Sequence, residues 1–191
     1  MELPDRKEAL ELFFEYTKTE SLRKHGLAVE QVLRSYARKN DEDEELWGIT
    51  GLLHDFDYER HPTANEHPMV GVSILREKEY PEACCEAIMG HAAYTGTPRN
   101  TLLSKVLFAS DELTGFIFAV TYVRPSKSIH DVKVKSVTKK LKTSSFAAKV
   151  SREDIALGIE ELGVERAEHI QFVIDALKEK ASELGLAGEE N

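Results

Sequence analysis

Apolar side chains recur at helical spacing along nearly the whole chain, and no segment alternates apolar and polar residues as a β-strand does. Prolines and turn-forming stretches divide this pattern into segments of helix length. The pattern therefore predicts an all-α protein. The expected helices are residues 4–18, 21–39, 43–54, 68–78, 81–92, 102–123, 133–141, 152–162 and 166–184, with Ser21 as an N-cap and residues 185–191 as a frayed tail.

The chain of 191 residues is long enough to bury a sizeable core, so we expect one domain over residues 1–191. Its amino terminus is charged and lacks a secretory cleavage pattern. Its most apolar run, residues 113–123, is shorter than the roughly 20 residues of a membrane helix. These features predict a cytoplasmic protein with no membrane partner. The adjacent Cys84 and Cys85 offer neither a disulfide framework nor a cysteine-rich zinc site.

Charge is unevenly distributed. The chain carries a net charge of -9, yet residues 124–152 hold nine basic side chains against one acid, Asp131, a net charge of +8. This balance argues against general nucleic-acid binding and favours a localised anion such as a phosphate group. We expect Lys127, Lys133 and Lys135 to bind substrate phosphate. A solvated helix face explains the same lysines, and the sequence leaves both interpretations open.

Several polar side chains occupy positions that should face the protein interior. His25 lies in the apolar stripe of its helix, His54 ends the third predicted helix, and His91 follows the apolar line of another. Asp111 interrupts a long apolar helix, where an unpaired carboxylate is costly to bury. Imidazoles and carboxylates are good metal ligands, and a cation offsets the cost of burying the acids. Satisfied core histidines with capping acids are the alternative.

The spacing allows two metal ions. His54 and Asp55 are adjacent at a helix end, where both can reach one ion. His67 can ligate a second ion, although its place before Pro68 also suits a cap. Asp57 and Glu59 can orient a ligand histidine, can serve as a base, or can be surface acids. The expected ligands are His25, His54, Asp55 and Asp111 for the first ion, and His67, His91 and a bridging Asp55 for the second.

The ordered series of His25, the doublet His54-Asp55 in GLLHD, and Asp111 in ASDELTG resembles the HD-domain superfamily of metal-dependent phosphohydrolases. The resemblance covers about residues 20–120, so residues 124–186 would form a basic and helical C-terminal extension of a compact helical bundle. His67 in EHPMVG and His91 in GHAAYTG are similar to the additional ligands of binuclear members.

The resemblance implies an enzyme that cleaves the phosphate ester of a nucleotide or other small phosphorylated metabolite with a metal-activated water. Asp55 and Asp111 would be its catalytic residues, with Asp111 also able to orient the attacking water. The cofactor would be one or two divalent ions of iron, manganese, zinc, cobalt or nickel. An HD-type di-iron oxygenase and a non-catalytic metal- or nucleotide-binding module are the alternatives. The oligomeric state stays open.

Overall fold

The computed structural model describes residues 5–188, and its chain divides into two compact units, Met1–Phe108 and Ala109–Asn191. The boundary between the units falls inside one helix, α6 (Leu102–Tyr122). Each unit is helical, and residues 5–188 contain no β-strand beyond one isolated bridge between Ser128 and Ala187. The all-α prediction is therefore confirmed. The expectation of a single domain stays a prediction.

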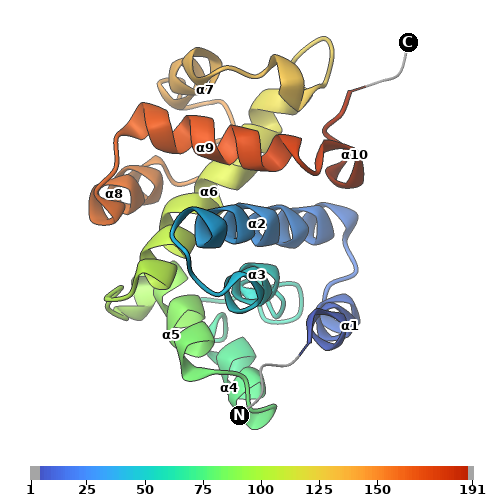
Figure 1. The fold of residues 1–191 in the computed structure, drawn as a ribbon, viewed down its shortest axis with the longest axis vertical. Coiled ribbons are helices and arrows are strands. Elements are labelled where there is room, and N and C mark those ends of the chain that lie inside the picture. Colours follow the sequence, from blue (N-terminus) through green and yellow to red (C-terminus); the bar gives the residue numbers. More distant parts are fainter. Residues whose placement is uncertain (1–4, 189–191) are drawn as a thin grey trace. The chain divides into compact units, whose positions relative to one another are not determined.

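The described residues of the first unit form five α-helices before α6 (Figure 1). Their bounds agree with the sequence pattern to within about two residues. These helices are connected by short turns, apart from the longer segment between the third and fourth helices. That segment begins with the His-Asp doublet, His54 and Asp55. The elements are α1 (Arg6–Tyr16), α2 (Glu20–Lys39), α3 (Glu44–Leu53), α4 (Met69–Glu77), α5 (Glu82–His91) and the 3-10 helix η1 (Ala93–Thr95).

The central contact of this unit joins α2 and α3. The apolar stripe of α2 is buried, including Val29 and Leu33, and each such side chain contributes about 1.5–3 kcal/mol when fully buried. A Cβ atom built on Gly51 would lie 2.9 Å from the carbonyl oxygen of Val29 and 3.0 Å from backbone atoms of Glu30. Glycine is therefore required where α3 approaches the backbone of α2. This approach fixes the end of α3, which carries His54.

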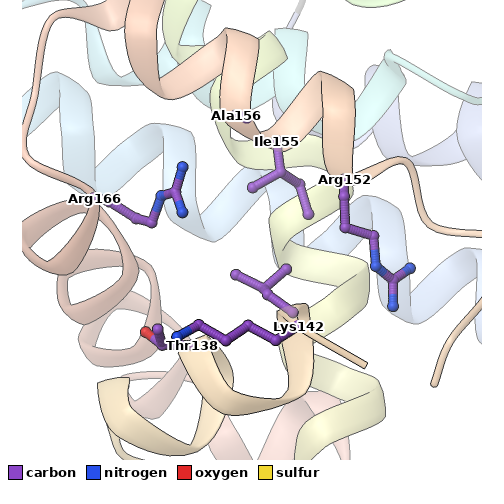
Figure 2. Close-up of a pocket in the computed structure, with 7 residues that line it drawn as sticks. Thr138, Lys142, Arg152, Ile155, Ala156 and Arg166 are labelled. Carbon is purple, nitrogen blue, oxygen red and sulfur yellow. The ribbon is translucent and has the colours of Figure 1, made fainter. Parts of the chain in front are cut away.

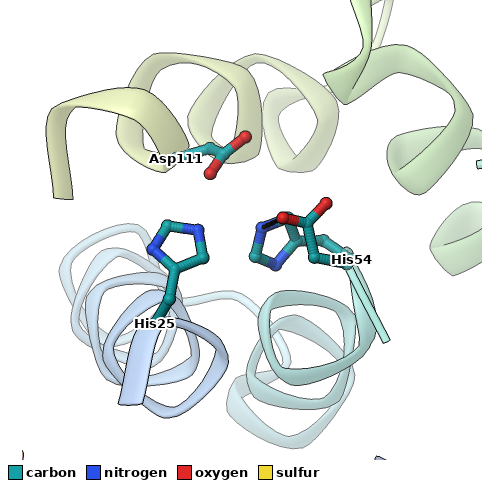
Figure 3. Close-up of side chains that lie close together, drawn as sticks. His25, His54 and Asp111 are labelled. Carbon is teal, nitrogen blue, oxygen red and sulfur yellow. Dashed lines mark ion pairs between the residues drawn. The ribbon is translucent and has the colours of Figure 1, made fainter. Parts of the chain in front are cut away.

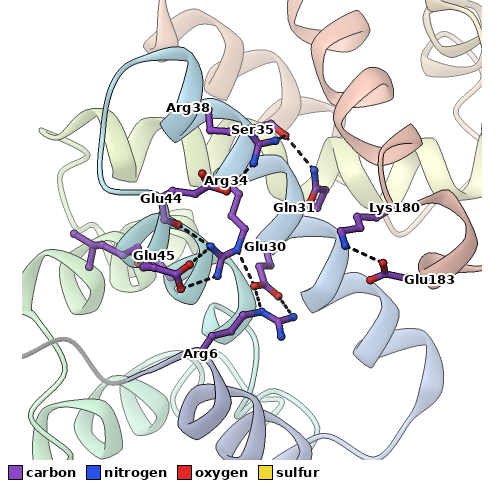
Figure 4. Close-up of polar contacts among 12 residues, drawn as sticks. Arg6, Glu30, Gln31, Arg34, Ser35, Arg38, Glu44, Glu45, Lys180 and Glu183 are labelled. Atoms are coloured by element: carbon purple, nitrogen blue, oxygen red, sulfur yellow. Dashed lines mark hydrogen bonds and ion pairs between the residues drawn. The ribbon is translucent and has the colours of Figure 1, made fainter.

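A buried carboxylate ties three helices together (Figure 4). Glu30, on α2, accepts hydrogen bonds from Arg6 of α1 at 2.5 and 2.9 Å and from Arg34 Nε at 2.9 Å. Arg34 donates in turn to Glu45 of α3 at 2.8 Å. Since Arg34 is only 11% exposed, the cost of burying its charge is offset by these two acidic partners. The network holds α1 and α3 against α2.

The start of α2 differs from the sequence expectation. The N-cap is Thr19 rather than Ser21, and no side-chain cap bond comes from Thr19 itself. Instead, Glu59 accepts hydrogen bonds from the backbone N–H groups of Lys18 and Thr19, at 2.7 and 3.0 Å. These bonds lower the pKa of Glu59. An acid from the segment after the His-Asp doublet therefore caps the helix that carries His25, which local sequence could not reveal.

The second unit contains the remainder of α6 followed by shorter helices, of which α9 contacts most of the others. The expected helix over residues 166–184 is wrong in one respect, because it breaks after Lys178. The elements are η2 (Ile129–Asp131), α7 (Val134–Leu141), α8 (Arg152–Leu162), α9 (Arg166–Lys178) and α10 (Ala181–Leu184).

The expected frayed tail is also wrong for its described part. Leu186 is fully buried, and its carbonyl oxygen accepts a hydrogen bond from the Ile129 N–H at 2.8 Å. Residues 185–188 are thus docked within the second unit. Residues 189–191 lie outside the described part of the chain.

Candidate metal centre

The end of α3 directs two potential ligands into one place. His54 is the C-cap of the helix and is fully buried. Its Nδ1–H donates to the carbonyl oxygen of Gly51 at 2.8 Å, which leaves Nε2 directed elsewhere. Asp55, the next residue, is only partly exposed, and its Oδ2 lies 3.5 Å from His54 Nε2. Adjacent residues thus present a nitrogen and an oxygen toward one another.

Two further histidines reach the same carboxylate from other elements. His67 precedes α4, and His91 ends α5. Their Nε2 atoms lie 3.2 and 3.1 Å from Asp55 Oδ1 and 3.3 Å from each other. Asp55, His67 and His91 therefore form a group whose ligand atoms all lie within 4.8 Å of one another. Such a group could hold a metal ion.

In each of His54, His67 and His91, the hydrogen bond made by Nδ1 determines whether Nε2 is available to bind a metal ion. Nδ1 of His91 lies 2.5 Å from the carbonyl oxygen of Ile88, just as Nδ1 of His54 lies beside a carbonyl. Nδ1 of His67 lies 2.8 Å from Asp57 Oδ1. Carbonyl and carboxylate oxygens accept hydrogen bonds, so each Nδ1 carries the proton and each neutral ring has its lone pair on Nε2. This is the tautomer that a metal-binding imidazole requires.

Asp57 is the buried partner that orients His67. Its Oδ1 accepts the His67 Nδ1–H, and its Oδ2 accepts the Gly71 N–H of α4 at 2.8 Å. A Cβ atom on Gly71 would lie 2.7 Å from the Asp57 carboxyl carbon, so only glycine leaves room for the carboxylate. The sequence left the role of Asp57 open. Its position supports orientation of a ligand rather than a surface location.

A second group of possible ligands consists of His25, His54, Asp55 and Asp111 (Figure 3). Each residue offers one ligand atom, and these atoms also lie within 4.8 Å of one another. His25 lies on α2, with its ring centroid 5.1 Å from that of His54. Asp111 lies on α6, just beyond Phe108. The residues that the sequence assigned to a first ion and to a second ion are thus the same two groups.

Residues 22–115 match the family model of the HD domain. The chain is an HD-domain protein. This domain indicates membership of a superfamily of metal-dependent phosphohydrolases, and the matched range contains every histidine and aspartate of both groups. Comparison with curated proteins and with solved structures found no match to this chain.

The chemistry of the HD-domain ligands fits a divalent metal ion. The two groups offer only imidazole nitrogens and carboxylate oxygens, which suit several divalent transition metals and do not choose among them. The buried Nδ1–H bonds hold the rings in place before any ion arrives. A cation also balances the charge of carboxylates that are largely removed from water.

The electrostatics of the HD-domain cluster are consistent with that fit. Burial raises the pKa of Asp55, but His54, followed by His67 and His91, lowers it more when these rings are protonated and donate from Nε2, to well below its usual range. Burial lowers the pKa of His67, whereas Asp55 and Asp57 raise it, to about 9. The cluster thus combines an ionised carboxylate with an imidazole whose proton a metal ion can replace.

The basic segment of the HD-domain protein lies in the second unit. Lys127, Lys133 and Lys135 are all exposed, and nothing in the structure tests their predicted contact with phosphate. The same unit has a pocket of about 150 Å³ (Figure 2). Its lining combines an apolar wall with three basic residues and no acid, a combination that suits the anionic end of a small molecule. The lining residues are Thr138, Leu141, Lys142, Arg152, Ile155, Ala156 and Arg166.

The three basic residues of this pocket differ in their contacts and in their positions. The guanidinium group of Arg152 donates to backbone carbonyl oxygens, among them those of Ala147 at 2.6 Å and Val150 at 2.7 Å. It therefore fixes the segment before α8. Figure 2 shows the side chain of Arg166 across the pocket from Arg152, and the side chain of Lys142 extending along the lower edge of the pocket toward Thr138. The sequence placed Lys142 in the basic segment and Arg166 outside it, and predicted no binding role for either residue.

No helix among the described residues combines the length and apolar character needed to cross a membrane. The predicted cytoplasmic location and the predicted partners stay predictions.

Proposed function

We propose that this HD-domain protein hydrolyses the phosphate ester of a small phosphorylated molecule, with a divalent metal ion as its cofactor. The observation that carries the proposal is the convergence of His67 Nε2 and His91 Nε2 on one oxygen of Asp55, at 3.2 and 3.1 Å. The family match supports the reaction class. A divalent ion bound here would lower the pKa of a bound water, so that hydroxide is available near neutral pH.

The protein's own residues would divide the remaining work. Asp55 would take part in both ligand groups, because its two oxygens face different histidines. His67 would be held in register by Asp57, and His91 by the Ile88 carbonyl. We propose that Asp111 completes the first group and orients the attacking water. The water oxygen forms the new bond to phosphorus as the ester P–O bond breaks, and the leaving oxygen takes up a proton.

The basic segment would assist by charge. We propose that Lys127, Lys133 and Lys135 attract the phosphate of the substrate, because exposed ammonium groups in a segment with a net charge of +8 produce a positive field. A small phosphorylated metabolite such as a nucleotide is the expected partner.

Elemental analysis of protein purified without added metal or chelator tests the proposal. The wild type should contain one or two divalent ions per chain and should release inorganic phosphate from members of a phosphate-ester panel. Asp55→Ala should lose the metal and the activity while its helical circular dichroism is retained. Glu86→Ala, which removes an exposed acid of α5, is the matched control and should retain both.

The number of ions and the reaction are read separately. His91→Ala should lose one ion if the wild type contains two. Full metal content in Asp55→Ala would refute the proposed centre. Two irons accompanied by oxygen consumption, without phosphate release, would identify the oxygenase alternative instead.

A further inference from the structure

Two tyrosines of the first unit are unusually exposed for large aromatic residues. Tyr58 is 41% exposed and Tyr94 is 56% exposed. Among the described residues of this unit, they are the two most exposed large hydrophobic side chains. Isolated exposed apolar residues are ordinary on a protein surface, but neighbouring ones commonly mark a binding site.

Both tyrosines contact the same histidine of the candidate centre. The ring of Tyr58 meets the ring of His67 edge to face, with centroids 5.2 Å apart. The hydroxyl group of Tyr94 donates to the carbonyl oxygen of His67 at 2.8 Å. The exposed aromatic surface of the unit therefore lies directly beside one of the three residues that converge on Asp55.

The two rings reach this position from different segments that also carry cluster residues. Tyr58 lies in the turn that follows Asp55, and Tyr94 lies in η1, directly after the helix that ends at His91. The side chains of Tyr58 and Tyr94 are already held by their contacts with His67. Stacking of a ligand on either ring would therefore cost little additional conformational entropy. A rigid aromatic surface next to a charged cluster is suited to a ligand with a planar end and an anionic end.

A phenol ring presents a flat aromatic face to a planar group. Stacking between such a ring and a planar base is largely insensitive to which base it is.

We propose that Tyr58 and Tyr94 are specificity-determining residues that hold a planar ring of the substrate beside the metal centre. The ring would be a nucleobase or another aromatic group of the phosphate ester. This inference rests on the proposed function, because it assigns the substrate class of the same centre.

The test is a binding preference measured by isothermal titration calorimetry on metal-loaded protein. Adenosine 5′-monophosphate and ribose 5-phosphate share a phosphate and a sugar, and only the first carries a planar base. The wild type should bind the first at least about tenfold more tightly, as expected for a single stacked base. Tyr58→Ala and Tyr94→Ala should each reduce that ratio, and the double variant should bring it to within about twofold of unity.

Three controls separate stacking from structural damage. Tyr94→Phe keeps the ring and loses the hydrogen bond to His67, so it should retain the preference. Tyr122→Ala removes a tyrosine of the second unit that is 43% exposed and should also leave the ratio unchanged. Metal content is measured in every variant. Equal binding of the two probes by the wild type, or a preference that survives the double substitution, would overturn the inference.

Failure of the inference and failure of the proposed function give different results. If the wild type hydrolyses both probes and binds them equally, the phosphohydrolase function stands and the inference about Tyr58 and Tyr94 fails. If no phosphate ester is hydrolysed, the proposed function fails. The binding ratio and its dependence on Tyr58 and Tyr94 still decide whether the two rings hold a base.

Discussion

The carboxylate of Asp57 accepts a hydrogen bond from Nδ1 of His67 at 2.8 Å, and neither side chain has appreciable contact with solvent. A buried carboxylate makes an imidazole a stronger ligand and fixes its rotation. Asp57 reaches no other histidine through a described hydrogen bond. The contribution of this one pair can therefore be measured by single substitutions.

Substitution of Asp57 by Asn should weaken metal binding by about 10- to 100-fold, the usual effect of losing an outer-shell carboxylate. The amide keeps the size of the side chain but removes its charge. The affinity can be measured by competition with a chromogenic chelator. Glu59→Gln is the control, because Glu59 lies in the same turn but bonds to the start of α2, and it should bind metal as the wild type does. Unchanged affinity in Asp57→Asn would show that this hydrogen bond does not tune the centre.

Gly71→Ala should destabilise the protein, although alanine normally stabilises a helix relative to glycine. The new Cβ atom would lie 2.7 Å from the Asp57 carboxyl carbon and would displace it. The expected loss is about 1–3 kcal/mol of unfolding free energy, as for other overpacked sites, accompanied by weaker metal binding.

Urea denaturation and the chelator assay measure these two effects of Gly71→Ala. Ser73→Ala, at an exposed position of the same helix α4, should change neither quantity by much. A gain in stability for Gly71→Ala would mean that α4 moves away from Asp57 without penalty.

Glu30→Ala should strongly destabilise the first unit, because Glu30 is a buried charged residue. It removes the carboxylate between Arg6 and Arg34 and leaves Arg34, which is 11% exposed, with Glu45 as its remaining acidic partner. The expected loss is roughly 2–3 kcal/mol, below the full cost of an isolated buried charge.

The matched control for Glu30→Ala is Glu11→Ala, which breaks an exposed pair between Lys7 and Glu11 at 3.9 Å. This change should cost less than about 0.5 kcal/mol. Both losses are measured by urea denaturation at the same ionic strength. A loss of similar size for the two variants would contradict a special role of the Glu30 network.

Stability should fall at alkaline pH because of the buried thiols of α5. Burial raises the pKa of Cys84 to about 12 and that of Cys85 to about 11. In the unfolded chain both thiols ionise near pH 8.5. The folded state keeps these protons, so its advantage is complete below about pH 8.5 and is lost as the pH rises toward the folded-state values.

Between pH 8.5 and 9.5, each buried thiol should lower the free energy of unfolding as the pH rises, with a slope approaching about 1.4 kcal/mol per pH unit. Denaturation under reducing conditions at several pH values measures this slope. Cys84→Ala should have a shallower pH dependence than the wild type even if its stability at pH 7 is lower. An identical slope would show that Cys84 does not titrate differently in the folded and unfolded states.

Most of the fold was predictable because helices have a local sequence signature. The period of the apolar residues gave the position of α2 and α3, and it placed His25 on the inward stripe. The doublet at the end of α3 identified the family, which the HD-domain match confirms. The break between α9 and α10 was missed, because Leu177, Ala181 and Leu184 keep helical spacing across it.

The candidate site was less predictable where it depends on contacts between segments. Asp57 and His67 both lie in the irregular segment between α3 and α4. That segment has no periodic pattern of apolar residues, so the sequence could not show that the two side chains meet. The cap that Glu59 provides to α2 spans 40 residues of sequence and is equally invisible locally. Metal binding by the predicted residues stays a prediction until the ion is measured.

The turn after α3 gives each of its residues a different task over a very short length of chain. Asp55 faces the histidines, Phe56 is fully buried, Asp57 bonds to His67, Tyr58 is exposed, and Glu59 caps α2. Removing or inserting a single residue here would move each later side chain of the turn into its neighbour's place, so that Phe56 and Tyr58 would exchange environments with the acids beside them. The segment should therefore tolerate many substitutions better than any change in its length, and variation in loop size among related chains should fall elsewhere.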